Sequence, residues 1–233
     1  MIDKFAALIP PSLLTHSGSV FYSGRTAFST PSALYILGLN PGGSPKGQTA
    51  ETVKWHTNKV LNEEAADWSA YQDEQWRGKP AGTVGMQPRV LHLLRELDLE
   101  PRKVPASNVA FVRSARGKDI KGCFRELAKL CWPFHQAVIE LLGVRVVLCL
   151  GKDSGSWVRE QLDANDLVDQ FVEVNNRRWT STSYKNSNGI GVVVATHPSI
   201  ADWTTPATDP SLLVQRMLAI GCHAAPTHDS FAF

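Results

Sequence analysis

Apolar residues along this chain form short continuous runs that alternate with stretches of helical periodicity. Four runs have strand length and lack polar alternation, which is typical of strands buried on both faces; they span 34–39, 108–112, 144–150 and 192–196. Strands that alternate with helices predict an α/β fold. We expect three α/β/α layers built around a central four-stranded parallel sheet.

Between these runs, apolar residues recur every three or four positions, as they do along one face of a helix. The pattern predicts helices over 88–97, 153–162 and 210–220. Within 124–141 it predicts two helices divided at Pro133, because proline fits the first turn of a helix. Residues 51–76 predict a further helix whose tryptophans pack back onto the body, and 171–191 predict a polar excursion of hairpin type.

The 233 residues, of which 43% are hydrophobic, are expected to form one domain with a substantial core. We divide it into an N-terminal extension (1–33), the body, an insertion (44–77) and a loose tail (221–233). The net charge of +2 excludes a strong positive field over the whole protein. No apolar run approaches membrane-spanning length, and residues 1–11 lack a signal-peptide pattern, so a cytoplasmic protein is expected.

The cysteines do not form a metal-binding pattern. No two of them have the C-x-x-C spacing of zinc or cluster sites; they are Cys123, Cys131, Cys149 and Cys222. Cys149 lies in an apolar run, and Cys123 and Cys131 lie on apolar helical faces. Free core thiols are therefore favoured over a metal site or a disulfide.

Two of the apolar runs end abruptly at a turn that carries one polar side chain. Asn40 follows the first run and precedes Pro41, while His197 follows the last run and precedes Pro198. The carboxyl ends of parallel strands lie along one edge of a sheet, where open α/β folds bind their ligands. Asn40 and His197 are therefore expected to face one pocket.

These residues resemble a known family. Gly38-Leu-Asn-Pro-Gly42 resembles the first motif of the uracil-DNA glycosylase superfamily, in the asparagine form of its mismatch-specific and single-strand-selective branches. His197-Pro-Ser199 is similar to its second motif. Residues 78–85 resemble the Gly-x-Pro-Phe-x-Gly segment of the iron–sulfur branch, and 107–113 resemble its Thr-Asn-Val-Val-Lys-Cys strand. The resemblance covers 34–43 and 78–199.

The departures from the family pattern carry information. Arg113 stands where the iron–sulfur branch has a cysteine, and of the cluster ligands only Cys131 remains, so no cluster, metal or other cofactor is expected. Ala81 stands where the family places a base-stacking phenylalanine. The stacking ring must come from elsewhere, or the substrate preference differs, or the pocket has lost this activity. Asn40 stands where the iron–sulfur branch carries an acid.

The resemblance implies a DNA glycosylase that hydrolyses the N-glycosidic bond of uracil or a related deaminated base. The departing base gains negative charge and the sugar gains positive charge. The Asn108 carboxamide suits uracil N3–H and O4, and a donor on His197 suits the charge at O2. Asn40 can only orient a water, since an amide does not accept a proton as a carboxylate does, so a slow enzyme is expected.

Further contacts follow from the same resemblance. Gly38 and Leu39 would line the base beside Asn108, and the DNA backbone would be contacted by Gly42, Gly43, Ser199, Arg113, Arg116 and Lys118. Ile200 or Trp203 would be the apolar wedge that fills the gap in the base stack. The expected partner is DNA with a deaminated base, bound by a monomer that needs no other protein and no membrane.

Each assignment has a structural alternative. Asn40 can be a turn former, His197 a strand-end histidine bonded to backbone, Asn108 a satisfied loop residue, the basic loop a solvated face and Trp203 a core residue. Two other functions stay open. One is a non-catalytic member of the same fold that binds a nucleobase or nucleic acid, as Ala81 and the near-neutral charge suggest. The other is a hydrolase or transferase with a phosphate cradle at the glycine-rich turn, for which no nucleophile–base pair is evident.

Overall fold

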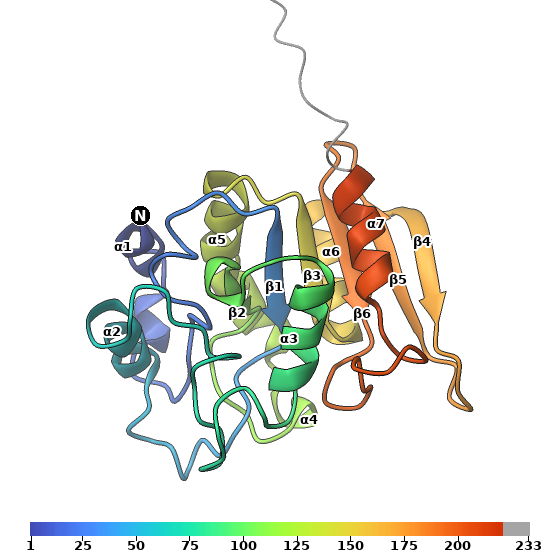
Figure 1. Cartoon of the computed structure of the whole chain (residues 1–233). Coiled ribbons are helices and arrows are strands. Elements are labelled where there is room, and N and C mark those ends of the chain that lie inside the picture. Colours follow the sequence, from blue (N-terminus) through green and yellow to red (C-terminus); the bar gives the residue numbers. More distant parts are fainter. Residues whose placement is uncertain (221–233) are drawn as a thin grey trace, which may run out of the picture.

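The sheet of the molecule has six strands in the order β2-β1-β3-β6-β5-β4 (Figure 1). The computed structural model describes residues 1–220. Four strands run parallel, as predicted: β1 (Leu34–Gly38), β2 (Ala106–Asn108), β3 (Val146–Leu150) and β6 (Gly191–Ala195). The prediction of a four-stranded sheet is wrong, because β4 (Asp166–Val172) and β5 (Thr180–Lys185) extend it in antiparallel fashion.

The two additional strands form the hairpin expected within the polar excursion, but the hairpin begins earlier and belongs to the sheet. Along β5, buried residues alternate with partly exposed ones, and β4 has no fully buried residue. Alternation of this kind is typical of antiparallel strands near a sheet edge. A search for continuous apolar runs therefore finds the inner strands and misses these two.

Strand β2 begins two residues earlier, and ends four residues earlier, than its predicted span of 108–112. Asn108 consequently ends the strand instead of beginning it, and it pairs with Gly38 at the end of β1. The apolar residues that follow Asn108 leave the sheet and enter the core, where Val109 and Phe111 are fully buried. The shift places the Asn108 side chain at the carboxyl edge, next to the first motif.

Helices cover both faces of the sheet, which confirms the three-layer arrangement. Strand residues alternate between the two faces: Tyr35 and Leu37 belong to one buried cluster, and Leu34 and Ile36 to the other. The first face is covered by α1 (Ile2–Ala6), α2 (Val53–Asn62), α5 (Phe124–Leu141) and α6 (Lys152–Leu162), and the second by α3 (Gln87–Glu96) and α7 (Ser211–Ile220). The short α4 (Gly117–Ile120) lies near the carboxyl ends of the strands (Figure 1).

Two helix predictions are wrong. Helix α5 continues through Pro133 without a break, because Cys131, Phe134 and Val138 keep one buried stripe on both sides of the proline. The helix predicted over 51–76 is limited to α2, which Thr52 caps by accepting a hydrogen bond from the Trp55 N–H. After α2 the chain turns, and Trp68 is buried while Trp55 stays 44% exposed.

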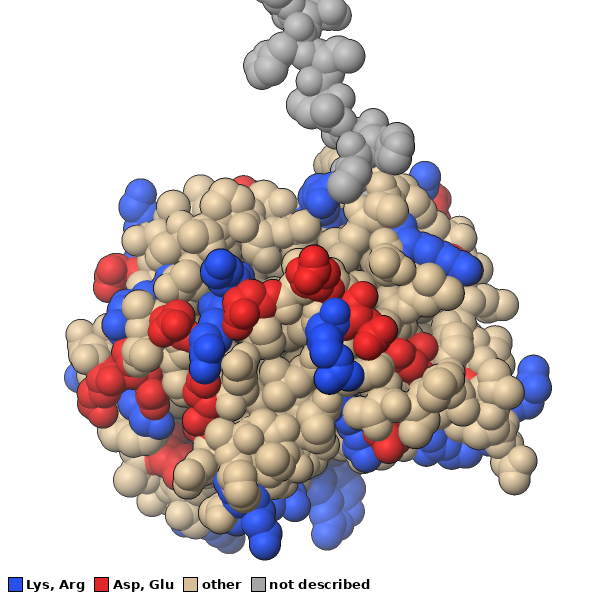
Figure 2. Space-filling view, in the orientation of Figure 1, with Lys and Arg blue, Asp and Glu red and all other residues tan. Residues whose placement is uncertain are grey.

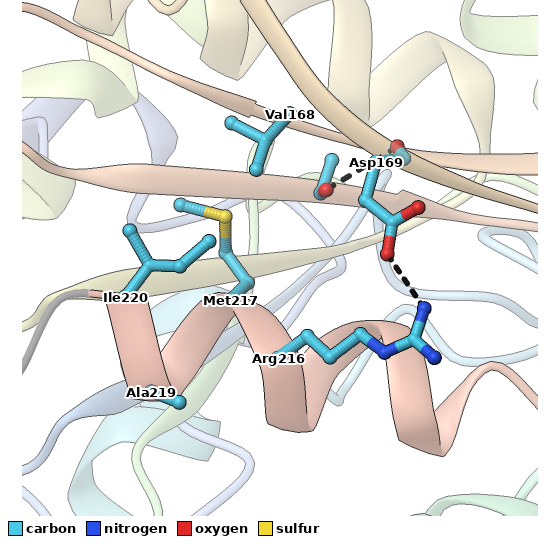
Figure 3. A pocket seen from close by; sticks show the side chains of 7 residues that line it. Val168, Asp169, Arg216, Met217, Ala219 and Ile220 are labelled. Carbon is cyan, nitrogen blue, oxygen red and sulfur yellow. Dashed lines mark hydrogen bonds and ion pairs between the residues drawn. The ribbon is translucent and has the colours of Figure 1, made fainter.

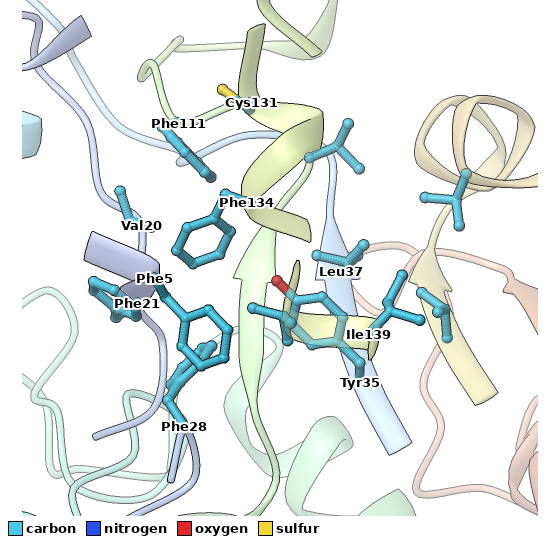
Figure 4. Close-up of a cluster of buried hydrophobic side chains, with 14 of the residues drawn as sticks. Phe5, Val20, Phe21, Phe28, Tyr35, Leu37, Phe111, Cys131, Phe134 and Ile139 are labelled. Atoms are coloured by element: carbon cyan, nitrogen blue, oxygen red, sulfur yellow. The ribbon is translucent and has the colours of Figure 1, made fainter. Parts of the chain in front are cut away.

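The residues before β1 are part of the core. Phe5 and Phe21 contact Phe134 edge to face, with ring centroids 6.1 Å and 5.5 Å apart, and Phe111 contacts it at 5.2 Å (Figure 4). This aromatic cluster holds the segment before β1 along the free edge of β2, where the Tyr22 N–H donates to Ala106 O. The predicted extension 1–33 therefore helps to form that edge.

A buried histidine connects α5 to β1. His135 is fully buried, with Nδ1 2.8 Å from the Tyr35 hydroxyl and Nε2 3.2 Å from Val109 O. Since the carbonyl can only accept, Nε2 carries the proton and the tyrosine donates to Nδ1. Desolvation lowers the pKa of His135 to about 4, although the bond to Val109 O opposes the shift.

This histidine makes the stability of the protein sensitive to acid. Below pH 6.5 the unfolded chain binds a proton at this position, but the folded chain does so only near pH 4, so the free energy of unfolding falls as pH drops through that window. His135 contributes up to about 1.4 kcal/mol per pH unit. Urea denaturation at pH 7, 6 and 5 should show a shallower pH slope for His135→Gln than for the wild type. Equal slopes would contradict the assignment of a neutral His135.

Candidate functional site

The ends of the four parallel strands lie level with one another. Gly38 pairs with Asn108, Leu37 pairs with Cys149, and Leu150 pairs with Ala195, two residues before His197. The β2 and β6 strands are three strand spacings apart, or about 14 Å at ~4.8 Å per spacing. Two side chains and one nucleobase can bridge that distance. The register therefore brings Asn40, Asn108 and His197 to one edge, as the sequence predicted.

Asn108 is buried and retains an unused donor. The residue is 6% exposed, and its Nδ2 makes no hydrogen bond of normal geometry with the described residues, although the Asn108 side chain lies close enough to the Tyr22 hydroxyl to lower the pKa of that group. Its Oδ1 lies so close to Gly38 that a Cβ added there would be 2.2 Å from it. An unpaired buried amide costs about 1–3 kcal/mol. Structural amides are normally paired, so this donor is a candidate for ligand binding because it also lies at the carboxyl edge of the sheet; His56 Nδ1 and Trp157 Nε1 are likewise buried without a partner but lie elsewhere.

His197 has a defined tautomer. The Ser199 backbone N–H donates to His197 Nδ1 at 3.0 Å, so Nδ1 is an acceptor and the neutral ring carries its proton on Nε2. Burial lowers the pKa of His197 below its usual value. The ring is therefore neutral at pH 7 and retains one N–H that can donate to a ligand. The alternative that His197 is a strand-end histidine bonded to the backbone is right in that this bond exists. The bond occupies only Nδ1, however, and leaves Nε2 available.

Asn40 connects two loops of the edge. Its Nδ2 donates to Pro41 O, Val112 O and Ser114 Oγ at 3.1, 3.1 and 2.8 Å. Two of these partners are carbonyls that can only accept, which fixes the orientation of the amide. Its Oδ1 makes no hydrogen bond within residues 1–220. The Nδ2 group of Asn40 thus has a structural role, and its Oδ1 remains as a single hydrogen-bond acceptor.

The prediction that Arg113 contacts DNA is wrong. Its side chain is only 10% exposed and lies 3.0 Å from Glu51, while Nη1 donates to Gly42 O at 2.6 Å and Nε donates to Ser17 Oγ at 3.1 Å. All these partners belong to the protein, so Arg113 fixes the glycine turn after β1. Gly43 in that turn has φ 118°, a left-handed conformation that favours glycine.

Of the two predicted wedge residues, only Ile200 remains available. Trp203 is fully buried, and its Nε1 donates to Thr196 O at 3.0 Å, so its assignment as a wedge is wrong. Ile200 is 52% exposed, and Ser199 beside it is also exposed. Their loop is held from beneath by Arg89, which donates to Pro198 O.

Positive charge gathers at the same edge despite the near-neutral total. Arg116, the residue that precedes α4, and Lys118, which lies within α4, are both exposed. Figure 2 shows basic side chains along the lower margin, where α4 lies in Figure 1, while acidic and basic side chains are mixed across the middle of the visible face. The lower margin is thus locally basic, as a nucleic-acid footprint requires.

Tyr22 is a site candidate that the sequence analysis missed. Its partly exposed ring packs against the buried clusters of both sheet faces, so it lies at the end of the sheet beside β2. Burial raises the pKa of Tyr22, and interactions with Ser19 and Asn108 oppose the shift. Tyr71 continues the aromatic surface, with its ring centroid 6.2 Å from that of Tyr22. A single tyrosine in a polar loop gives no sequence signal for such a role.

Two hollows of the described surface lie apart from these side chains. One, of about 340 Å³, lies between α7 and the β4–β5 hairpin, with the Asp169–Arg216 ion pair on its wall (Figure 3). The other, of about 250 Å³, lies beside Leu39 and is lined by residues of α4, α5 and α6. Neither is lined by Asn40, Asn108 or His197. The base pocket between Asn108 and His197 therefore stays a prediction.

The cysteines are free where they are described. Cys131 and Cys149 are buried, but Cys123 is exposed, contrary to its predicted place on an apolar face. Burial raises the pKa of the Cys131 thiol to about 12. Cys222 and the tail predicted for 221–233 lie outside the described residues. Within residues 1–220, no group of three or more His, Cys, Asp or Glu residues could hold a metal ion.

Comparison with known proteins gives no relative: no family model and no curated protein matches the chain. Among the described helices, none combines the length and apolar character needed to span a membrane.

The tautomer of His197 can be measured without any substrate. In ¹⁵N-correlated NMR spectra, His197 should show a bare Nδ1 and a protonated Nε2 above pH 6.5, because the Ser199 N–H occupies Nδ1. Protonation should occur with a midpoint below 6.5, since burial disfavours the cation. A doubly protonated ring at pH 7, or a proton on Nδ1, would contradict this geometry.

Proposed function

We propose that this protein is a uracil-DNA glycosylase-type enzyme that hydrolyses the N-glycosidic bond of uracil or a related deaminated base in DNA. The observation that carries the proposal is the presence of two hydrogen-bond donors at one sheet edge that the protein does not engage in bonds of normal geometry. They are Asn108 Nδ2 and the Nε2–H of a neutral His197. The parallel strand order β2-β1-β3-β6 and the motif sequences support a fold of the uracil-DNA glycosylase type. The enzyme would act as a cytoplasmic monomer, without a metal or another cofactor.

Base recognition falls to Asn108. The extruded uracil would receive a hydrogen bond from Nδ2 at O4 and give one from N3–H to Oδ1. Cytosine presents the opposite pattern and would leave buried groups unpaired, a penalty that can reach roughly 10⁴-fold. Gly38 allows this placement because it has no Cβ. The Tyr22 ring provides an aromatic wall beside Asn108, which the family pattern would otherwise place at Ala81.

Catalysis falls to His197 and Asn40. A neutral Nε2–H aimed at O2 strengthens its bond as negative charge develops on the departing base, and loss of one such donor costs roughly 10²–10³ in rate. Asn40 Oδ1 accepts a hydrogen bond from the attacking water and orients it. No carboxylate is assigned to take up the proton of that water, so the bond to the base must break first and leave the sugar largely cationic. The proton released when water adds to the sugar then passes to solvent or to the departed base anion.

The remaining edge would hold the DNA. Arg116 and Lys118 supply charge for phosphates, Ser199 supplies its hydroxyl, and the turn at Gly42 and Gly43 supplies backbone N–H donors. Ile200 would fill the gap left by the extruded nucleotide.

A binding protein without activity is the second candidate. Ala81 favours it, because the missing ring removes a base-stacking contact that the resemblance implies. Such a protein would bind a nucleobase or DNA through Asn108 and release no base.

The central test is release of free base from oligonucleotides that contain uracil, hypoxanthine or xanthine. The wild type should release uracil or one of the related bases, and His197→Ala should do so roughly 10²–10³ times more slowly because it loses the O2 donor. His92→Ala is the matched control, because His92 is bonded to Asp209 between α3 and α7. No release by the wild type from any of these substrates would reject the enzymatic proposal.

Selectivity tests the role of Asn108 separately. Asn108→Ala should lose discrimination between uracil and cytosine, measured as the ratio of kcat/KM values for matched oligonucleotides. Gly38→Ala should have a similar effect, because the added Cβ would lie 2.2 Å from Asn108 Oδ1 and displace the amide. Gly122→Ala is the control, since its Cβ would meet nothing within 4 Å. An unchanged ratio in both site variants would remove Asn108 from base recognition.

A further inference from the structure

The tip of the β4–β5 hairpin lies at the same sheet edge as His197. Strand β5 runs antiparallel to β6, with Thr182 paired to Val194, so the turn that precedes β5 lies beyond the carboxyl end of β6. Val172 and Thr180 close this turn, and 173–179 form the tip (Figure 1).

The tip is rigidly built. Glu173 is 1% exposed, and its Oε2 accepts hydrogen bonds from Asn175 Nδ2 at 2.8 Å and Arg177 Nη2 at 3.3 Å. Asn175 Oδ1 in turn accepts the backbone N–H groups of Arg177 and Arg178 at 2.9 and 3.1 Å. A turn with this many internal bonds presents its outer side chains in fixed positions.

Arg177 joins the tip to the loop after His197. Its Nη1 donates to Ile200 O at 2.6 Å, and its guanidinium stacks 4.2 Å from the centre of the Trp179 ring. The residue proposed as the wedge and the exposed ring of the hairpin are thus held by one side chain. Arg177 thus places the tip next to the loop that carries Ile200.

The outer surface of the tip combines apolar and cationic groups. Trp179 is 38% exposed and Val174 is 74% exposed, so both apolar side chains face solvent. Arg178 is exposed and its side chain has no ion pair with the described residues. The acid of the tip, Glu173, is buried. An aromatic ring beside a free cation suits a stacked base and its phosphate.

We propose that the hairpin tip binds single-stranded DNA next to the extruded nucleotide, with Trp179 stacked on an unpaired base and Arg178 at a phosphate. A base inside a duplex has no free face for the ring, so the contact favours single strands. The inference rests on the proposed function, since the Arg177 bond to Ile200 O places the tip beside the residue proposed to face DNA. It extends that function by naming the strand state of the substrate.

The experiment uses the full-length protein and a fluorescent oligothymidylate, which contains no deaminated base. Binding is followed by anisotropy against salt concentration, and a duplex of equal length is measured in parallel. Trp179→Ala should weaken single-strand binding roughly 5- to 150-fold, because base–aromatic stacking is worth ~1–3 kcal/mol per base. Arg178→Asn should reduce the salt slope by about 0.7, the value for one phosphate of a single strand; asparagine also suits the φ of 47° at this position.

Two matched controls separate the tip from general effects. Trp55→Ala removes another half-exposed tryptophan, located on α2. Lys185→Ala removes a cation at the other end of β5. Both variants should bind like the wild type, and melting temperatures should show that all four variants are folded.

The outcomes decide two questions independently. Three results would overturn the hairpin proposal. The wild type and Trp179→Ala could bind the single strand equally well, the control variants could lose as much affinity as the tip variants, or the wild type could prefer the duplex. Weakened binding by the tip variants, in a wild type that releases no base, would support the hairpin and reject the glycosylase.

Discussion

The level ending of four parallel strands is the constraint on which the whole site depends. Asn108, the turn at Asn40 and the loop of His197 come from three separate parts of the chain, and only the strand register aligns them. The register is fixed by alternation of buried residues between the two helical layers, because a slip of one residue would exchange the two faces. The core therefore specifies the geometry of the site.

Much of the polar chemistry at this edge holds loops in place. Arg113 fixes the glycine turn, Arg89 and Arg177 support the two sides of the His197 loop, and the Asn40 amide joins two loops. These bonds fix the loops around the strand ends. Asn108 Nδ2 and His197 Nε2–H are the two donors on which the proposed base contacts depend, since the proposed substrate presents a planar, acceptor-rich group to this edge.

The inner strands and the three layers could be predicted because continuous apolar runs directly reflect burial on both faces. The hairpin strands could not, since β4 and β5 are half exposed and carry polar residues. The motif residues Asn40, Asn108 and His197 were placed correctly at one edge. Arg113 and Trp203 were misassigned because sequence gives the charge or size of a side chain but not its partners, and Tyr22 was missed because its position depends on the aromatic cluster around Phe134.

The most direct test of the account is whether one base contacts Asn108 and His197 together. Free uracil can be titrated into ¹⁵N-labelled protein while the Asn108 side-chain amide and the His197 Nε2–H are observed by NMR. We expect both signals to shift with the same saturation curve, while the signal of the Asn62 amide, which is bonded within α2, stays unchanged. A response at only one of the two groups, or at neither, would show that they do not share a base pocket.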